Sequence, residues 1–221
     1  MSTTYELVVL DMAGTTVVDD GLVEGAFARA WDRVKATDEG REAALDHVRA
    51  TMGQSKIDVF RAIADEETAQ SLNEQFEESF RELIAEGQCE AIPGAEDAIV
   101  ALRERGLKIA FTTGFSRPTA DAILASLGWT ELADVVLSPA DAGRGRPAPD
   151  LVLTALIRTE ASSVASVVVV GDTESDAASG RSAGAGLVIG VLTGSRDEAS
   201  LRAAGAHLVL ASVADLPTAL Q

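Results

Sequence analysis

The sequence contains very little cysteine and no long apolar run, and both absences narrow the class of protein. A single cysteine, Cys89, excludes an internal disulfide framework and is compatible with a reducing compartment. Nowhere do about 18 apolar residues follow one another without a charge, as a membrane span requires. Residues 1–11 also lack the basic and apolar segments of an export signal. We therefore expect no membrane span, no export and a cytoplasmic location.

Basic residues are also scarce. The chain has 18 Lys and Arg against 35 Asp and Glu, which gives a formal net charge of −17. The average surface therefore repels nucleic acid and anionic lipid, and we expect neither as a partner. A phosphorylated substrate would need a local group of cations in an otherwise acidic protein.

Aromatic residues make up only 4% of the chain, but 47% of it is hydrophobic. At 221 residues, this composition favours one globular domain, or one domain that carries a smaller insertion. Short apolar runs predict the strands of a sheet, and helical patterns over Ala95–Arg105 and Pro118–Leu127 separate them, each followed by a glycine at the expected end of the helix. The predicted strands are Glu6–Leu10, Leu107–Phe111, Asp134–Leu137, Ser166–Val170, Gly186–Val191 and His207–Leu210. This alternation predicts an α/β fold with a doubly wound parallel sheet, Rossmann-like in its layers.

A long gap separates the first predicted strand from the second. It is rich in Ala, Glu, Gln and Arg, and apolar residues recur at helical spacing in Val23–Val34, Ile57–Ile63 and Phe76–Ile84. We therefore predict a helical domain over residues 19–90, inserted into an α/β core of residues 1–18 and 91–221. Its hinges are expected near Val17–Asp20 and Glu90–Pro93.

Polar motifs stand beside the predicted strand ends, where open parallel sheets bind their ligands. The four motifs are Asp11-Met12-Ala13-Gly14-Thr15-Thr16, Thr112-Thr113-Gly114, Gly145-Arg146-Pro147-Ala148-Pro149-Asp150 and Gly171-Asp172-Thr173-Glu174-Ser175-Asp176. Each motif alone is as well explained by turn and helix-cap chemistry. Together, in this order, they indicate a site for phosphoryl chemistry.

The residue types suggest a role for each motif. Asp11 is the candidate nucleophile, because a carboxylate can accept a phosphoryl group and divide one displacement into two steps. Asp172 with Asp11, and Asp176 nearby, form a candidate Mg²⁺ site of oxygen ligands. Arg146 and the hydroxyl of Thr112 are expected to hold phosphoryl oxygens. Backbone N–H groups of the turn over residues 14–16 are expected to form an anion-binding nest.

With these motifs the chain resembles the haloacid dehalogenase superfamily over essentially its whole length. The resemblance implies Asp11 as the nucleophile, Thr112 and Arg146 as phosphate-holding groups, and Asp172 and Asp176 as Mg²⁺ ligands. It also implies a metal ligand in the backbone carbonyl of Ala13, and it makes the insertion a helical type 1 cap.

Two positions narrow the resemblance to one branch. Phosphatases of the superfamily usually carry an acid two residues after the nucleophile, where this chain has Ala13. The first two motifs, Gly145-Arg146-Pro147 of the third, and Met52-Gly53-Gln54-Ser55-Lys56 in the insertion resemble the phosphonatase branch. That branch cleaves phosphonoacetaldehyde through a Schiff-base lysine. The resemblance thus implies Lys56 as that lysine, and substrate contacts from Gly14, Thr15, Thr113, Gly114, Met52 and Gly53.

Three functions remain open at this point. The first is cleavage of the C–P bond of phosphonoacetaldehyde or a related carbonyl phosphonate, with Lys56 as an electron sink. The second is a phosphatase of small phosphate monoesters, since Val59 replaces the histidine common in phosphonatases and Ala148-Pro149-Asp150 resembles ordinary phosphatases. The third is a non-catalytic binding protein, against which the complete set of motifs argues. Related phosphonatases dimerise through their caps, so the resemblance also implies a possible homodimer.

Overall fold

The computed structural model describes residues 4–35 and 37–221. Its centre is a sheet of six parallel strands in the order β3-β2-β1-β4-β5-β6. The strands are β1 (Leu7–Asp11), β2 (Lys108–Thr112), β3 (Val135–Leu137), β4 (Val167–Gly171), β5 (Leu187–Val191) and β6 (Leu208–Leu210). Each lies in or within one residue of a predicted run, so the predicted parallel α/β sheet is confirmed. The order reverses beside β1, which places the switch point of the sheet next to Asp11.

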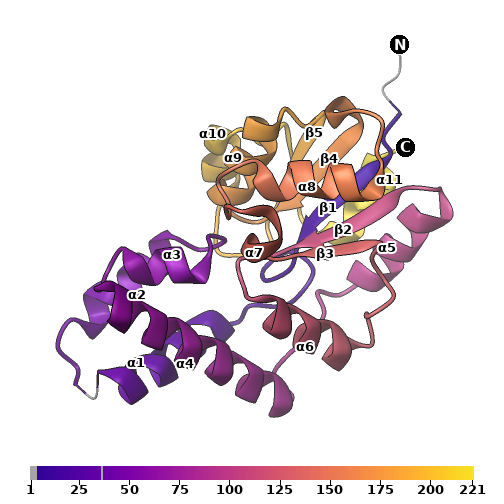
Figure 1. The fold of residues 1–221 in the computed structure, drawn as a ribbon. Coiled ribbons are helices and arrows are strands. Elements are labelled where there is room, and N and C mark those ends of the chain that lie inside the picture. The colour runs from indigo at the N-terminus through magenta and orange to yellow at the C-terminus, as the bar shows by residue number, and fades with distance from the viewer. Residues whose placement is uncertain (1–3, 36) are drawn as a thin grey trace.

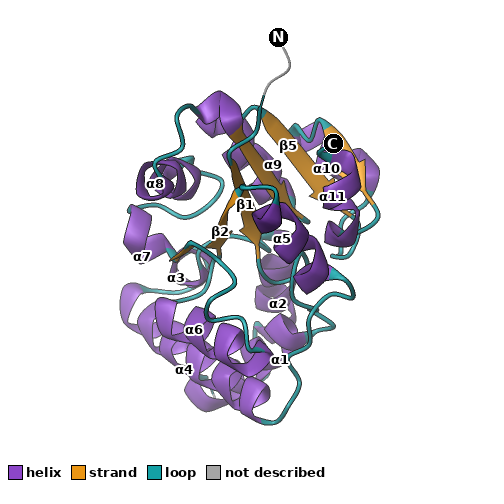
Figure 2. Ribbon diagram, turned by 90° about the vertical axis from the view of Figure 1, so that its right-hand side faces the viewer, coloured by secondary structure: helices purple, strands orange, loops and turns teal. Residues whose placement is uncertain are grey.

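Helices cover both faces of the sheet. Successive side chains of β1 point to opposite faces, and all five are buried, so each face needs an apolar layer against it. Val8 and Leu10 belong to one apolar cluster, whereas Leu7 and Val9 belong to the other. The first cluster includes residues of α5 (Ala95–Glu104), α6 (Arg117–Leu127) and α11 (Leu216–Ala219), and the second residues of α8 (Asp150–Thr159), α9 (Glu174–Ala183) and α10 (Glu198–Ala204). Short elements are α7 (Pro139–Ala142) and the 3₁₀ turns η1 (Val164–Ser166) and η2 (Val213–Asp215). Figure 2 shows the sheet between these helices.

The insertion between β1 and α5, which we call the helical segment (residues 19–90), holds α1 (Leu22–Val34), α2 (Arg41–Ala50), α3 (Lys56–Arg61) and α4 (Glu66–Ala85). Figure 1 shows these helices gathered beyond one end of the sheet. The aromatic rings of Phe27, Phe60 and Phe76 pack in sequence through the segment. Phe76 also packs on Phe115, which follows β2, so the apolar core continues from the segment into the sheet domain.

Two connections join the helical segment to the sheet domain, and they run side by side. Val18 N–H donates to the Glu90 carbonyl at 2.9 Å, and Ile92 N–H donates to the Thr16 carbonyl at 2.9 Å. These two hydrogen bonds hold the two connections together where the chain passes between the sheet domain and the helical segment. Of the helices that the structure describes, none combines the length and the apolar character needed to cross a lipid bilayer.

Candidate active site

The site forms where three strands end at one edge of the sheet. Asp11 is paired in register with Thr112 of β2, and Leu10 with Val170 of β4. Because the strands are parallel, the turn after each strand opens toward the helical segment. The carboxyl ends of β1, β2 and β4 thus bring three of the predicted motifs together.

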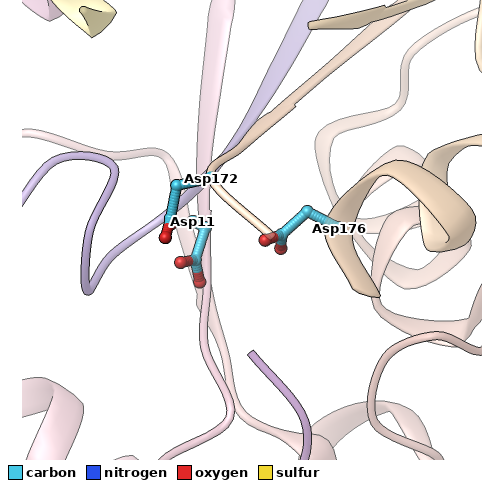
Figure 3. A group of neighbouring side chains, drawn as sticks. All are labelled: Asp11, Asp172 and Asp176. Atoms are coloured by element: carbon cyan, nitrogen blue, oxygen red, sulfur yellow. The ribbon is translucent and has the colours of Figure 1, made fainter. Parts of the chain in front are cut away.

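Three buried carboxylates converge at this edge (Figure 3). Asp11, Asp172 and Asp176 each offer one oxygen within 4.8 Å of the others. Burial raises the pKa of Asp11 to about 7, with a contribution from Asp176 and against the lowering by Arg146. Burial also raises the pKa of Asp172 well above its usual value, and the charges of Asp11 and Asp176 add to this.

This acidic cluster, Asp11, Asp172 and Asp176, fits a divalent cation. Three carboxylates crowded away from water repel one another, and Arg146 supplies a single positive charge against them. The donors are all oxygens, which are the ligands that Mg²⁺ prefers. Ala13, whose carbonyl is a predicted ligand, lines the same pocket. The residues present therefore suit the predicted magnesium site.

Helix-cap and hydroxyl contacts hold two of these carboxylates in place. Thr15 Oγ1 donates to Asp172 Oδ1 at 2.8 Å. Asp176 Oδ2 accepts from the N–H of Thr173 at 3.1 Å and from its hydroxyl, which forms the capping box at the start of α9. Thr15 is absent from the lining of the pocket, so the geometry indicates an orienting role rather than the predicted substrate contact.

Arg146 reaches into the acidic cluster from the loop before α8. Its Nη1 lies 2.6 Å from Asp11 Oδ1 and also contacts Asp176 Oδ1. Its Nε is buried and has no hydrogen-bond partner in the described part of the chain. Arg146 thus neutralises part of the acidic charge and keeps one donor uncommitted.

The turn after β1 differs from the predicted anion-binding nest. Gly14 N–H donates to the Val17 carbonyl at 2.7 Å, and the N–H groups of Thr15 and Thr16 donate to the Met12 carbonyl. These donors close the turn, so the nest prediction is wrong. Gly14 has φ +85°, and a Cβ there would meet the carboxylate of Asp172. Only glycine therefore allows the turn to pass so close to the acidic cluster.

The two threonines after β2 have different surroundings. Thr112 Oγ1 donates to the Leu10 carbonyl at 3.5 Å, and Thr112 is not among the residues that line the pocket. Thr113 and Gly114 do line it. The geometry does not support the predicted role of Thr112, and it favours Thr113 as the hydroxyl that holds a phosphoryl oxygen. At a strand end adjacent side chains point to opposite sides, so a shift of one residue exchanges the two roles.

A pocket of about 530 Å³ lies between this edge of the sheet and the helical segment. It brings together Asp11, Lys56, Arg146 and Asp172 from four separate parts of the sequence. Further predicted site residues in its lining are Ala13, Gly14, Met52, Gly53, Thr113 and Gly114.

Lys56, the first residue of α3, is only 6% exposed. Its Nζ lies 5.3 Å from the ring centre of Phe115 and 5.9 Å from that of Phe76. Burial lowers the pKa of Lys56, and Arg146 adds to this, while Asp19 is the strongest opposing charge. The lysine is therefore in surroundings that favour its neutral, nucleophilic form.

Glycines allow the helical segment to approach the sheet domain closely. A Cβ on Gly114 would meet the Gln54 carbonyl, and a Cβ on Gly145 would lie 2.8 Å from the Cβ of Ser55. Lys56 N–H donates to the Gly114 carbonyl at 3.1 Å. These contacts fix the start of α3 against the loop after β2, which places Lys56 in the pocket.

Two carboxylates at this interface were not predicted as site residues. Asp19 lines the pocket from the first connection, and it was assigned only to a hinge. Glu77 of α4 is buried and accepts hydrogen bonds from the N–H and the hydroxyl of Ser116, at 3.0 and 2.6 Å. A single acidic residue in a loop or on an acidic helix carries no signal of its own in the sequence. Only the fold shows that Asp19 lines the pocket and that Glu77 contacts the sheet domain.

Comparisons with known proteins show the family and the fold that this chain resembles. The model of the haloacid dehalogenase-like hydrolase family matches residues 5–184. A phosphonoacetaldehyde hydrolase of Bacillus cereus (strain G9842) is 34% identical over 213 residues, covering 87% of this chain and 77% of the relative. A hydrolase from Pseudomonas syringae has a similar structure, with a TM-score of 0.85, 25% identity and 97% of each chain covered. A phosphonoacetaldehyde hydrolase-like protein from Oleispira antarctica gives a TM-score of 0.79 and 25% identity, covering 98% of this chain and 91% of that one.

Proposed function

The chain belongs to the haloacid dehalogenase-like hydrolase family, and we propose that it cleaves the carbon–phosphorus bond of phosphonoacetaldehyde or a closely related carbonyl phosphonate. One observation carries the proposal: a buried lysine, Lys56, shares a pocket with Asp11 and Arg146. The position two residues after Asp11 is Ala13, so the usual acid for an alkoxide leaving group is absent there. The curated relatives named phosphonoacetaldehyde hydrolase support the same substrate class.

Asp11 is the proposed nucleophile toward phosphorus. Arg146 contacts Asp11, and its Nε has no hydrogen-bond partner among the described residues, so it suits a phosphoryl group placed beside Asp11. Thr113, from the neighbouring strand end, would hold another oxygen. Asp11, Asp172, Asp176 and the carbonyl of Ala13 would hold Mg²⁺, and the bound ion supplies charge neutralisation at the phosphoryl oxygens. The acyl phosphate on Asp11 is then hydrolysed by water.

Lys56 is proposed to activate the carbon side of the bond. Its neutral amine condenses with the aldehyde and releases water, which leaves a protonated imine next to the C–P bond. When Asp11 attacks phosphorus, the electron pair of the C–P bond moves into the imine and the carbon leaves as an enamine. The enamine takes up a proton, and hydrolysis of the imine releases acetaldehyde. The rings of Phe76 and Phe115 lie beside the amine.

A phosphatase of small phosphate monoesters is the second candidate, and one observation favours it. Val59, at the position where phosphonatases commonly carry a histidine, is 3% exposed and packs within the apolar core. It therefore brings no proton donor to the pocket. In this alternative Lys56 only binds the substrate, and its replacement leaves turnover of a suitable ester intact.

The test is an assay of phosphate and acetaldehyde release from phosphonoacetaldehyde with Mg²⁺, beside a panel of phosphate monoesters. We expect release from the phosphonate in the wild type and near-complete loss in Lys56→Met. Lys35→Met is the matched control, because Lys35 is an exposed lysine at the end of α1 in the same segment. Ester turnover that survives Lys56→Met, without phosphonate turnover in the wild type, would select the phosphatase.

A further inference from the structure

The imine chemistry of Lys56 requires a group that gives and takes protons, and this inference rests on the function proposed above. Formation of the imine needs a proton for the departing oxygen, and its hydrolysis needs that proton back. Val59 leaves no such group three residues after Lys56 on α3, because its side chain is apolar and buried. The group must then come from another element of the pocket.

Three carboxylates act on the charge of Lys56, namely Asp19, Asp11 and Glu77, and two of them are already engaged. Asp11 is ion-paired with Arg146 in the acidic cluster. Both oxygens of Glu77 accept hydrogen bonds from Ser116 at the start of α6. Asp19 is the remaining carboxylate, and its charge is the strongest that opposes the effect of burial on Lys56.

Asp19 lies in the wall of the pocket and is held there by the backbone. Its Oδ1 accepts from the N–H of Val23 in the first turn of α1, at 3.1 Å. Its Oδ2 takes no protein hydrogen bond within the residues described. Asp19 and Lys56 also form no contact ion pair in that part of the chain, although both line the same pocket. A substrate carbonyl bound in this pocket would therefore have both side chains in its walls.

We propose that Asp19 is the acid–base group of the imine steps at Lys56. The Lys56 nitrogen forms a bond to the carbonyl carbon while the carbonyl oxygen takes a proton from the Asp19 carboxylic acid. The new ammonium returns a proton to Asp19. The hydroxyl then leaves as water with that proton, and the nitrogen lone pair forms the iminium, which leaves Asp19 ionised. Hydrolysis of the product imine runs these steps in reverse and returns the proton.

The surroundings of Asp19 favour its protonated form more than water does. Burial raises the pKa of Asp19, the charges of Glu24 and Asp20 raise it further, and Lys56 and the Val23 N–H oppose them. Glu24 is held by Arg49 in a bidentate ion pair, and Asp20 is exposed. Both also line the pocket, but neither is among the charges that act on Lys56. Asp19, in the connection between β1 and α1, thus supplies the acid–base group that α3 lacks at Val59.

The experiment compares Asp19→Asn with the wild type under single-turnover conditions. Asn keeps the oxygen that accepts from Val23 N–H, so this hydrogen bond to the first turn of α1 is retained, but Asn cannot exchange the proton. We expect the rate of borohydride-trapped adduct at Lys56 to fall by about 10²- to 10⁴-fold, the usual contribution of general acid–base catalysis. Because Asp19 donates as the carboxylic acid, the alkaline limb of the pH–rate profile, where the rate falls as Asp19 loses its proton, should disappear. Asp19→Glu should restore part of the rate. Asp58→Asn is the matched control, because Asp58 is 58% exposed, lies two residues from Lys56 and is absent from the lining of the pocket.

The outcomes separate the two proposals. A wild type that forms the adduct, with an Asp19→Asn variant equally fast and unchanged in its pH profile, overturns the role of Asp19 and leaves the proposed function standing. A wild type that forms no adduct overturns both. A slow Asp19→Asn variant with a normal melting temperature and no rescue by Asp19→Glu at any pH also contradicts the acid–base role. Partial rescue by Glu, which returns the titrating limb, supports it.

Discussion

Replacement of Asp11 by Asn removes the proposed nucleophile, and we expect it to stabilise the metal-free protein. Asp11 is one of three buried carboxylates whose oxygens lie within 4.8 Å of one another. Asn has nearly the same shape and keeps an oxygen for Arg146 Nη1. Arg146 also keeps its ion pair with Asp176, so the buried guanidinium is not left unpaired. The variant should therefore lose all turnover while it gains stability.

The magnitude follows from the pKa of Asp11, which is raised from 3.8 to about 7. A shift of about 3 units at 1.36 kcal/mol each gives an upper bound of about 4 kcal/mol at pH 8. Because the carboxylates titrate together, we expect a gain of about 1–4 kcal/mol. Between about pH 4 and pH 7 folded Asp11 holds a proton that the unfolded chain has lost, so the wild type loses stability as the pH rises through this window. The gain from Asn should thus be small near pH 4 and complete at pH 8.

Thermal unfolding in EDTA at several pH values between 4 and 8 measures this gain. For a chain of this size, 1 kcal/mol corresponds to about 2–4 °C in the melting temperature. Asp38→Asn is the control, because its side chain is 93% exposed and its replacement should change stability by less than about 0.5 kcal/mol. A variant that is less stable than the wild type at pH 8, or a difference that does not vary with pH, would refute the reasoning.

Three further predictions concern the pocket. Lys56→Met should abolish phosphonate turnover. It should also raise the free energy of unfolding by about 1 kcal/mol at neutral pH, because burial penalises the lysine charge. A melting temperature several degrees lower than that of the wild type would instead show a structural role. Gly114→Ala should lower turnover because its Cβ would press on the backbone of the helical segment, whereas Gly25→Ala, with no neighbour closer than 3.8 Å, should leave the kinetics unchanged; equal kinetics would contradict the close approach. Thr113→Val should lower kcat/KM by about 10- to 100-fold, because one hydrogen bond to a charged group is lost. Thr112→Val should not lower it. A loss in Thr112→Val but not in Thr113→Val would show that Thr112 holds the phosphoryl oxygen.

The strands and the acidic cluster could be predicted because each has a local signal. A buried parallel strand is a short apolar run, and the five residues of β1 and of β4 are all buried. Parallel strands end at the same edge, so Asp11 and Asp172 had to meet once β1 and β4 were neighbours. Lys56 was found through a resemblance of its flanking residues, since nothing in the spacing of a helix start indicates burial.

The finer features of the site depend on geometry that no local pattern contains. The choice between Thr112 and Thr113 depends on which side of a strand end faces the pocket, and a shift of one residue reverses it. The turn after Asp11 uses its own N–H groups to close on Met12 and Val17, which a glycine followed by threonines does not indicate. Asp19 and Lys56 line one pocket only because the helical segment folds back over the sheet edge. The first two features depend on local backbone geometry and the third on a long-range approach, and no residue pattern specifies either.

The central claim is that Lys56 acts through a covalent imine. The most direct measurement is peptide mass spectrometry after borohydride reduction of the protein with Mg²⁺ and phosphonoacetaldehyde. The account predicts one reduced two-carbon adduct, located on Lys56, that is absent without substrate and absent in Lys56→Met. Phosphate and acetaldehyde release by a protein that forms no such adduct, or an adduct located only on other lysines, would contradict it.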